Sequence, residues 1–221
     1  MGKVIAASML ILALTGMIGT VSGAEAWNTI MEETWSYDRP GALAHELVSW
    51  KKLSGFDGAF AKLRNESDQV VLSFSPEGMA APLITKEQYV ISATIRLEAK
   101  IRRLSSDGSW TRLSLLSASS RDIGYFVQIY SNKVELIRAD GEEARQLGVY
   151  EITQTALQKE PVTVALEIHP EKSTIAVSLD GREVIEAVDS PLLTFDNGVM
   201  IGLRAQSGVQ VEVSTVKLSS R

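Results

Sequence analysis

Between Tyr89 and Leu218 the chain repeats short segments in which every second residue is apolar, and turns containing Gly separate these segments. The clearest is 162–168, Val-Thr-Val-Ala-Leu-Glu-Ile, whose Val, Leu and Ile residues fall on one face of a strand. Segments 174–179 and 182–186 flank Asp180-Gly181, a pair that favours a two-residue hairpin turn because it tolerates positive φ. This pattern predicts an all-β fold, an antiparallel two-sheet β-sandwich with Val164, Leu166, Val177 and Ile201 in its core.

The spacing of these segments predicts ten strands after residue 88, at 89–104, 110–117, 125–130, 133–138, 145–150, 162–169, 174–179, 182–187, 199–204 and 209–218. Residues 27–75 are less regular, and we expect strands within 27–37, at 50–53 and at 69–74. This number of strands is typical of a jelly roll rather than a seven-stranded immunoglobulin sandwich.

The N-terminus has the order of a secretory signal peptide. Lys3 precedes an apolar run from Val4 to Ile18, and small residues follow up to Ala24. The alternative is a membrane anchor, but the run falls short of the roughly 20 apolar residues that a spanning helix needs. We therefore predict a signal peptide at 1–24, a single domain at 25–221, a secreted or periplasmic protein, and no stable membrane insertion after cleavage.

Composition limits the partners. The chain contains no cysteine, so its stability must come from burial rather than from disulfides. Its formal net charge of −5 argues against nucleic acid, because phosphate backbones attract clustered Lys and Arg. We expect no nucleic-acid partner.

Several segments resemble the concanavalin A-like lectin/glucanase superfamily in its laminin-G-like jelly-roll form. The hairpin 125–136 (Tyr-Phe-Val-Gln-Ile-Tyr, a turn, then Lys-Val-Glu-Leu) is similar to the central hairpin of that family, and 162–181 with 197–213 is similar to its closing half. Glu33-Thr-Trp-Ser-Tyr37 with Pro40-Gly41 is similar to the opening strand of exported bacterial members. The resemblance implies a glycoside hydrolase, a polysaccharide lyase or a non-catalytic binder. Only the residues of the site can distinguish among these three functions.

The sequence lacks the motifs that the catalytic members use. A retaining glucanase needs two carboxylates roughly 5 Å apart, and no strand carries a Glu-x-Asp-x-Glu run. For a lyase the resemblance implies Arg, His, Gln and Tyr, and Gln128-Ile-Tyr130 matches a Gln-Ile-His run only in part, with Arg96 and His169 as the other candidates. The two histidines lie far apart in sequence, which disfavours zinc.

We expect no cofactor, with one alternative. Asp189, Asp196 and Asn197 carry the oxygen ligands that calcium prefers, and rim calcium ions are common in the lectin-like relatives. Asp196-Asn-Gly198 is equally the composition of a tight turn.

A binding face is the remaining prediction. If Tyr125, Val127 and Ile129 point into the core, then Phe126, Gln128 and Tyr130 point outward, and Arg96 and Glu167 join them if the neighbouring strands adjoin. Outward aromatic rings beside polar groups suit a sugar ring. The alternative is that a second layer buries these aromatics, and the four Trp residues are likewise more typical of a core.

These observations favour an exported, non-catalytic binding module for carbohydrate or extracellular polysaccharide. The alternatives are a glycoside hydrolase or lyase with an atypical site, and a structural protein of the envelope or matrix.

Overall fold

The computed structural model describes residues 26–221 except 37, 39–40, 43–45, 53–60, 67–68, 75–82, 91–92, 105–108, 153–159 and 207. The predicted signal peptide at 1–24 lies outside the described residues. The described part of the chain has no α-helix, and within it no helix is long and apolar enough to cross a membrane. Its strands are β1 (Asn28–Glu33), β2 (Trp50–Lys52), β3 (Ala61–Glu66), β4 (Gln69–Phe74), β5 (Leu83–Thr85), β6 (Ile95–Arg103), β7 (Thr111–Ser117), β8 (Ser120–Ile129), β9 (Lys133–Asp140), β10 (Glu143–Glu151), β11 (Val162–His169), β12 (Thr174–Leu179), β13 (Arg182–Val188), β14 (Val199–Ala205) and β15 (Val211–Ser220).

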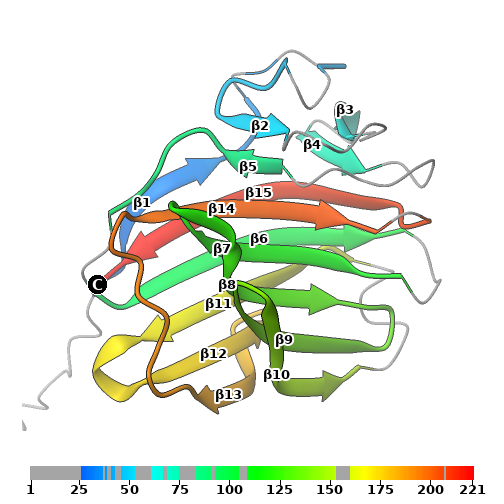
Figure 1. The fold of residues 1–221 in the computed structure, drawn as a ribbon. Coiled ribbons are helices and arrows are strands. Elements are labelled where there is room, and N and C mark those ends of the chain that lie inside the picture. Colours follow the sequence, from blue (N-terminus) through cyan, green and yellow to red (C-terminus); the bar gives the residue numbers. More distant parts are fainter. Residues whose placement is uncertain are drawn as a thin grey trace, which may run out of the picture.

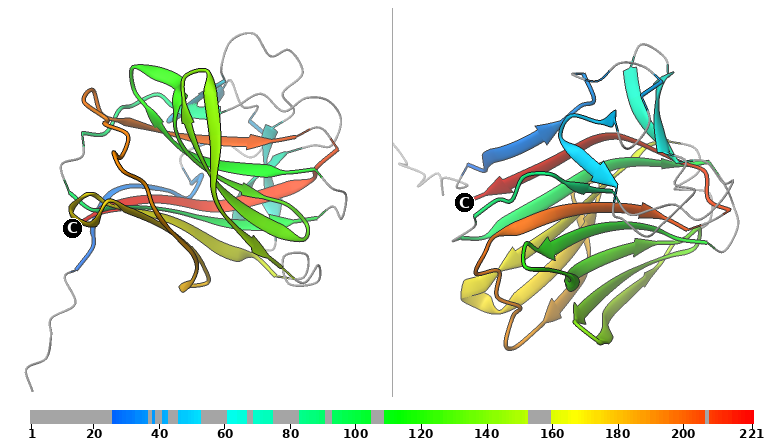
Figure 2. Two further views of the ribbon diagram at one scale, coloured as in Figure 1. Left: turned by 60° about the horizontal axis from the view of Figure 1, so that its bottom comes forward. Right: turned by 45° about the horizontal axis from the view of Figure 1, so that its top comes forward.

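The strands form two stacked antiparallel sheets (Figures 1 and 2). Sheet A has the order β13-β12-β11-β6-β15-β4-β3, and β1 also pairs with β15. Sheet B has the order β10-β9-β8-β7-β14-β5-β2. The predicted antiparallel two-sheet sandwich is confirmed.

Side-chain alternation divides each sheet into a core face and an outer face. The four predicted core residues, Val164, Leu166, Val177 and Ile201, are all buried between the sheets. The predicted hairpin is also present, because Leu179 pairs with Arg182 around an Asp180-Gly181 turn in which both residues have positive φ. Local sequence therefore sets both the register and the buried face of this half of the molecule.

Two expectations about strands are wrong in detail. The predicted strand 89–104 is divided, because Tyr89 forms an isolated bridge with Val199 of sheet B whereas β6, which begins at Ile95, lies in sheet A. The chain crosses between sheets within this segment. Strands β3 and β5 are absent from the predictions, since β3 is largely polar and β5 has only three residues.

Two of the four tryptophans belong to the core, as their residue type suggests. Trp35 and Trp50 are fully buried, with ring centroids 5.7 Å apart. The carboxylate of Glu33 accepts hydrogen bonds from the Trp35 backbone N–H at 2.7 Å and from Trp50 Nε1 at 3.3 Å. This buried acid therefore holds the two tryptophans together within the core.

Candidate functional site

A pocket of about 330 Å³ lies on the outer face of sheet B. The register brings Gly202 of β14, Ser114 of β7 and Phe126 of β8 side by side across three strands. The small residues hollow the sheet beside the Phe126 ring. A Cβ added to Gly202 would lie 3.1 Å from Leu116 Cδ1, so a larger residue there would crowd the pocket.

The floor of the pocket is apolar and separate from the core between the sheets. Phe126 packs with Ile84, Leu116 and Met200 in a small cluster of its own. Only 7% of Phe126 is exposed, although it points outward from β8 while Tyr125 and Val127 point into the core. The predicted orientation of the strand is correct, and the described residues of 27–75 join the sheets as strands instead of forming a layer over this ring.

A polar row borders this floor. Arg204 of β14, Arg112 of β7 and Gln128 of β8 are consecutive cross-strand partners. Arg112 Nη2 donates a hydrogen bond to Gln128 Oε1, and Gln128 Nε2 donates to the Tyr130 hydroxyl at 2.7 Å. The structure thus joins Gln128 and Tyr130 to Arg112, whose cross-strand partner is Arg204, and the sequence analysis singles out neither arginine.

Trp110 contacts both arginines at the border of the pocket, and the sequence analysis does not single it out as a site residue. Its ring lies 4.6 Å from the guanidinium carbon of Arg112 and 5.3 Å from that of Arg204. The Arg112 guanidinium also lies 4.7 Å from the Phe126 ring. The signal was available, because alternation along β7 places 110, 112, 114 and 116 on one face.

The environment of Arg112 disfavours its positive charge. Burial, and then the neighbouring charge of Arg204, lower the pKa of Arg112 from its ordinary value to about 10. Burial also lowers the pKa of Arg204. Arg112 still carries its charge at neutral pH, since a pKa of about 10 lies well above 7.

Arg96 and Glu167 do not join this site, which corrects the prediction that they support it. They pair with each other on β6 and β11, but both strands belong to sheet A. Arg96 forms ion pairs with Glu98 at 2.8 Å and with Glu167 at 3.3 Å on the outer face of that sheet. Alternation predicts that a side chain points outward, but it does not say from which sheet.

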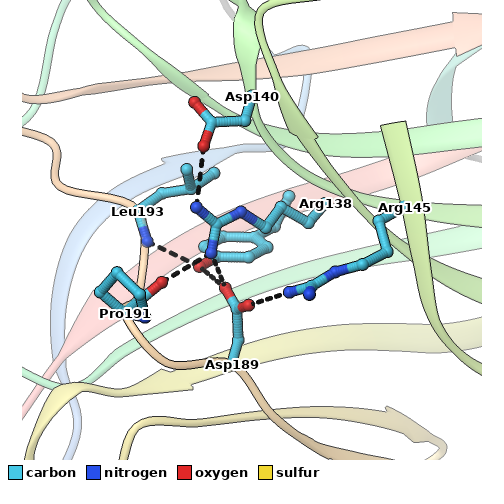
Figure 3. Close-up of polar contacts among 7 residues, drawn as sticks. Arg138, Asp140, Arg145, Asp189, Pro191 and Leu193 are labelled. Atoms are coloured by element: carbon cyan, nitrogen blue, oxygen red, sulfur yellow. Dashed lines mark hydrogen bonds and ion pairs between the residues drawn. The ribbon is translucent and has the colours of Figure 1, made fainter. Parts of the chain in front are cut away.

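Asp189 lies in a different environment from a calcium rim (Figure 3). It is fully buried, and its oxygens accept hydrogen bonds from Arg138 Nη1 at 2.7 Å and Arg145 Nη2 at 2.6 Å. The Tyr125 hydroxyl donates to the same carboxylate at 2.6 Å. Two guanidinium groups therefore occupy the oxygens that a cation would need.

The other two members of the calcium set lie in a tight turn. Asp196 and Asn197 are exposed, and the Gly198 N–H donates to the Phe195 carbonyl at 2.8 Å. Among the described residues no group of three or more His, Cys, Asp or Glu side chains is placed to hold a metal ion. The geometry supports the turn interpretation, and calcium at Asp196 and Asn197 stays a prediction.

Catalytic groups are sparse around the pocket. Asp122 is the one carboxylate among its described lining residues. His169, the histidine in the predicted lyase set, is the last residue of β11 in sheet A. Its Nε2 lies 3.5 Å from Glu167 Oε2. The predicted lyase residues are thus divided between the two sheets, with Gln128 and Tyr130 on one and Arg96 and His169 on the other.

Comparison with known proteins identifies the fold. No family model and no curated protein matches the chain. Among solved structures, it is similar to the β-glucanase of Bacillus licheniformis, with a TM-score of 0.61, 14% identity and coverage of 88% of this chain and 99% of that one. The carbohydrate-binding module CBM66 of Bacillus subtilis matches with a TM-score of 0.53, 14% identity and coverage of 79% and 97%. The carbohydrate recognition domain of Emp46p matches with a TM-score of 0.58, 16% identity and coverage of 78% and 88%.

These matches confirm the concanavalin A-like lectin/glucanase fold that the sequence resembles. Carbohydrate-binding modules, lectin domains and glucanases share this fold. At such low identities the likeness extends to the fold alone, so the role of this chain must be argued from its own pocket.

Proposed function

We propose that this protein is an exported, non-catalytic carbohydrate-binding module whose ligand occupies the pocket on the outer face of sheet B. The observation that carries this proposal is the combination of an aromatic floor with polar groups at its border. Phe126, Leu116 and Ile137 line the pocket with apolar surface, and Arg112 can donate hydrogen bonds to hydroxyl groups. Trp110 and Gln128 contact Arg112 at the border of the pocket. Sites of this composition hold small polar ligands by contact with their apolar faces and fix them by a few hydrogen bonds.

The pocket favours binding over hydrolysis. Glycoside hydrolysis uses two carboxyl groups that flank the scissile bond. The described lining contributes only Asp122. Export rests on the order of residues in the first 24 positions and is part of the same proposal.

A blocked pocket tests the proposal. In Ala139→Trp the new ring would fill the pocket from β9, and glycan retention on an array should be lost without a large fall in Tm. Thr163→Trp is the matched control, because Thr163 is also half-buried but lies on the outer face of sheet A. If Ala139→Trp still retains glycan, the binding site lies outside this pocket. Degradation of a glycan by the wild type, stopped by Asp122→Asn, would replace the proposal with an enzyme.

A further inference from the structure

We infer that the pocket binds an anionic saccharide, whose carboxylate or sulfate group contacts Arg112 with Arg204 beside it. This inference rests on the proposed function and names the chemical class of its ligand. It depends on how the fold places these two arginines.

Arg112 and Arg204 face each other across β7 and β14. Like charges directly opposite in a sheet destabilise the strand pair, and burial adds a desolvation cost. A position that breaks a local rule of stability in this way is where function is expected to account for the residues.

Arginines on the outer face of sheet A form ion pairs with carboxylates of the protein. Arg102 forms ion pairs with Glu212 at 2.6 Å and with Glu66 at 2.8 Å. Arg96 likewise pairs with Glu98 and Glu167. Both of these guanidinium groups are therefore neutralised from within the protein.

In the pocket, the residue opposite Arg112 on β8 is Gln128, a neutral amide where sheet A supplies carboxylates. Gln128 accepts one N–H of the guanidinium, whereas the buried Arg112 Nε has no hydrogen-bond partner. No carboxylate among the described residues forms an ion pair with Arg112. A bound anion would supply the charge that is absent here.

The geometry around Arg112 suits such a ligand. Trp110 and Phe126 lie against the guanidinium and restrict its orientation, and a planar guanidinium binds carboxylate or sulfate through paired hydrogen bonds. The apolar floor beside it can contact the face of the sugar ring. A volume of about 330 Å³ lies at the lower end of the range for small-ligand pockets, which suits a short stretch of glycan.

The test compares matched probes on the wild-type protein. Polygalacturonate is compared with its fully methyl-esterified form, and dextran sulfate with dextran, by affinity electrophoresis. We expect retention by at least one anionic probe, little by its uncharged partner, and weakening as salt is added.

Two variants then address Arg112 directly. Arg112→Met removes the cation, and Gln128→Glu places a carboxylate of the protein against it, so each should weaken anionic binding by about tenfold or more. Gln128→Glu adds an ion pair with Arg112 but also places a carboxylate opposite Glu135 of β9, so its Tm is compared with that of the wild type before binding is measured. Arg102→Met is the control, since it removes an arginine from the outer face of sheet A and should leave retention unchanged.

The outcomes separate the two proposals. Equal retention of charged and uncharged probes, or anionic retention that survives both Arg112→Met and Gln128→Glu, overturns the anionic ligand and leaves the carbohydrate module standing. Retention of neutral glycans alone also overturns the anionic ligand and leaves the carbohydrate module standing. Retention of no charged or neutral glycan overturns both.

Discussion

Two arginines on sheet B, Arg138 and Arg112, differ in the charge of the side chain that they contact. Arg138 and Arg145 both contact the buried carboxylate of Asp189, which follows β13 of sheet A, so this centre ties the two sheets together. Arg112 and Arg204 lie in the outer pocket, where the partner of Arg112 is the neutral Gln128. Arg138 and Arg145 therefore belong to a structural centre, whereas Arg112 contacts a neutral amide and is the residue that we propose to bind an anion.

The largest expected effect is at the compensated centre. Asp189→Asn removes the negative charge that both Arg138 and Arg145 contact, and we expect a loss of about 3 kcal/mol in the free energy of unfolding, measured by urea denaturation. Asp140→Asn is the control, because Asp140 pairs with the same Arg138 but is 54% exposed, and it should cost less than about 1 kcal/mol. Equal losses would mean that the centre contributes no more than a surface ion pair.

A smaller effect is expected at the tyrosine of this centre. The Tyr125 hydroxyl donates to Asp189 and accepts from the Leu193 N–H at 2.8 Å. Tyr125→Phe should therefore cost about 2 kcal/mol, because one of the lost hydrogen bonds is to a buried charge. Tyr150→Phe, a half-buried tyrosine that makes neither contact, should be close to neutral in the same denaturation experiment. If Tyr125→Phe is as stable as the control, the Tyr125 hydroxyl contributes nothing to the stability of this centre.

Substitution of Arg138 and of Arg112 tests the comparison directly. Arg138→Met leaves Asp189 with one cation fewer and should cost about 2 kcal/mol. Arg112→Met should change stability by less than about 1 kcal/mol, since relief of the repulsion from Arg204 offsets the hydrogen bond lost to Gln128. Thermal and urea unfolding would measure both, and a loss at Arg112 as large as that at Arg138 would make the pocket arginine structural.

The sequence predicts the half of the molecule in which structure follows from local pattern. Strands β11 and β12 and the Asp180-Gly181 turn are correct because alternation and turn preference are local properties. The site depends on which strands become neighbours. Gln128 and Tyr130 can be predicted together because they are two positions apart at the end of β8. Arg112 and Arg204 come together only through the pairing of β7 with β14, 92 positions apart along the printed sequence.

The same reason explains why Arg96 and Glu167 were misassigned. They are true cross-strand partners, but their strands lie in sheet A, and sheet membership is set by long-range pairing. The carboxylate of Asp189 makes it a candidate calcium ligand in the sequence, and no local signal shows that two arginines from β9 and β10 contact it. Chemistry-bearing residue types are readable from sequence, while their partners in space are not.

The smallest effect concerns pH. Burial and the charge of Arg204 lower the pKa of folded Arg112 from its ordinary value to about 10. The folded state therefore carries the full cost of this charge below pH 10 and loses that cost as the pH rises above about 10. The wild type should gain stability relative to Arg112→Met as the pH rises above that value, by at most about 1.4 kcal/mol per pH unit.

Paired urea denaturation of the two proteins between pH 7 and pH 11 measures this difference, because titrating groups that do not interact with Arg112 are common to both proteins and cancel. We expect a constant difference up to about pH 9 and an increase in favour of the wild type above it, since the deprotonated form is the one that the folded pocket prefers. A bound anion stabilises the charged form, so a saturating anionic probe should move the start of this increase to higher pH. A difference that stays flat to pH 11 would mean that Arg112 is as well compensated as Arg138, and the comparison between these two arginines would fail.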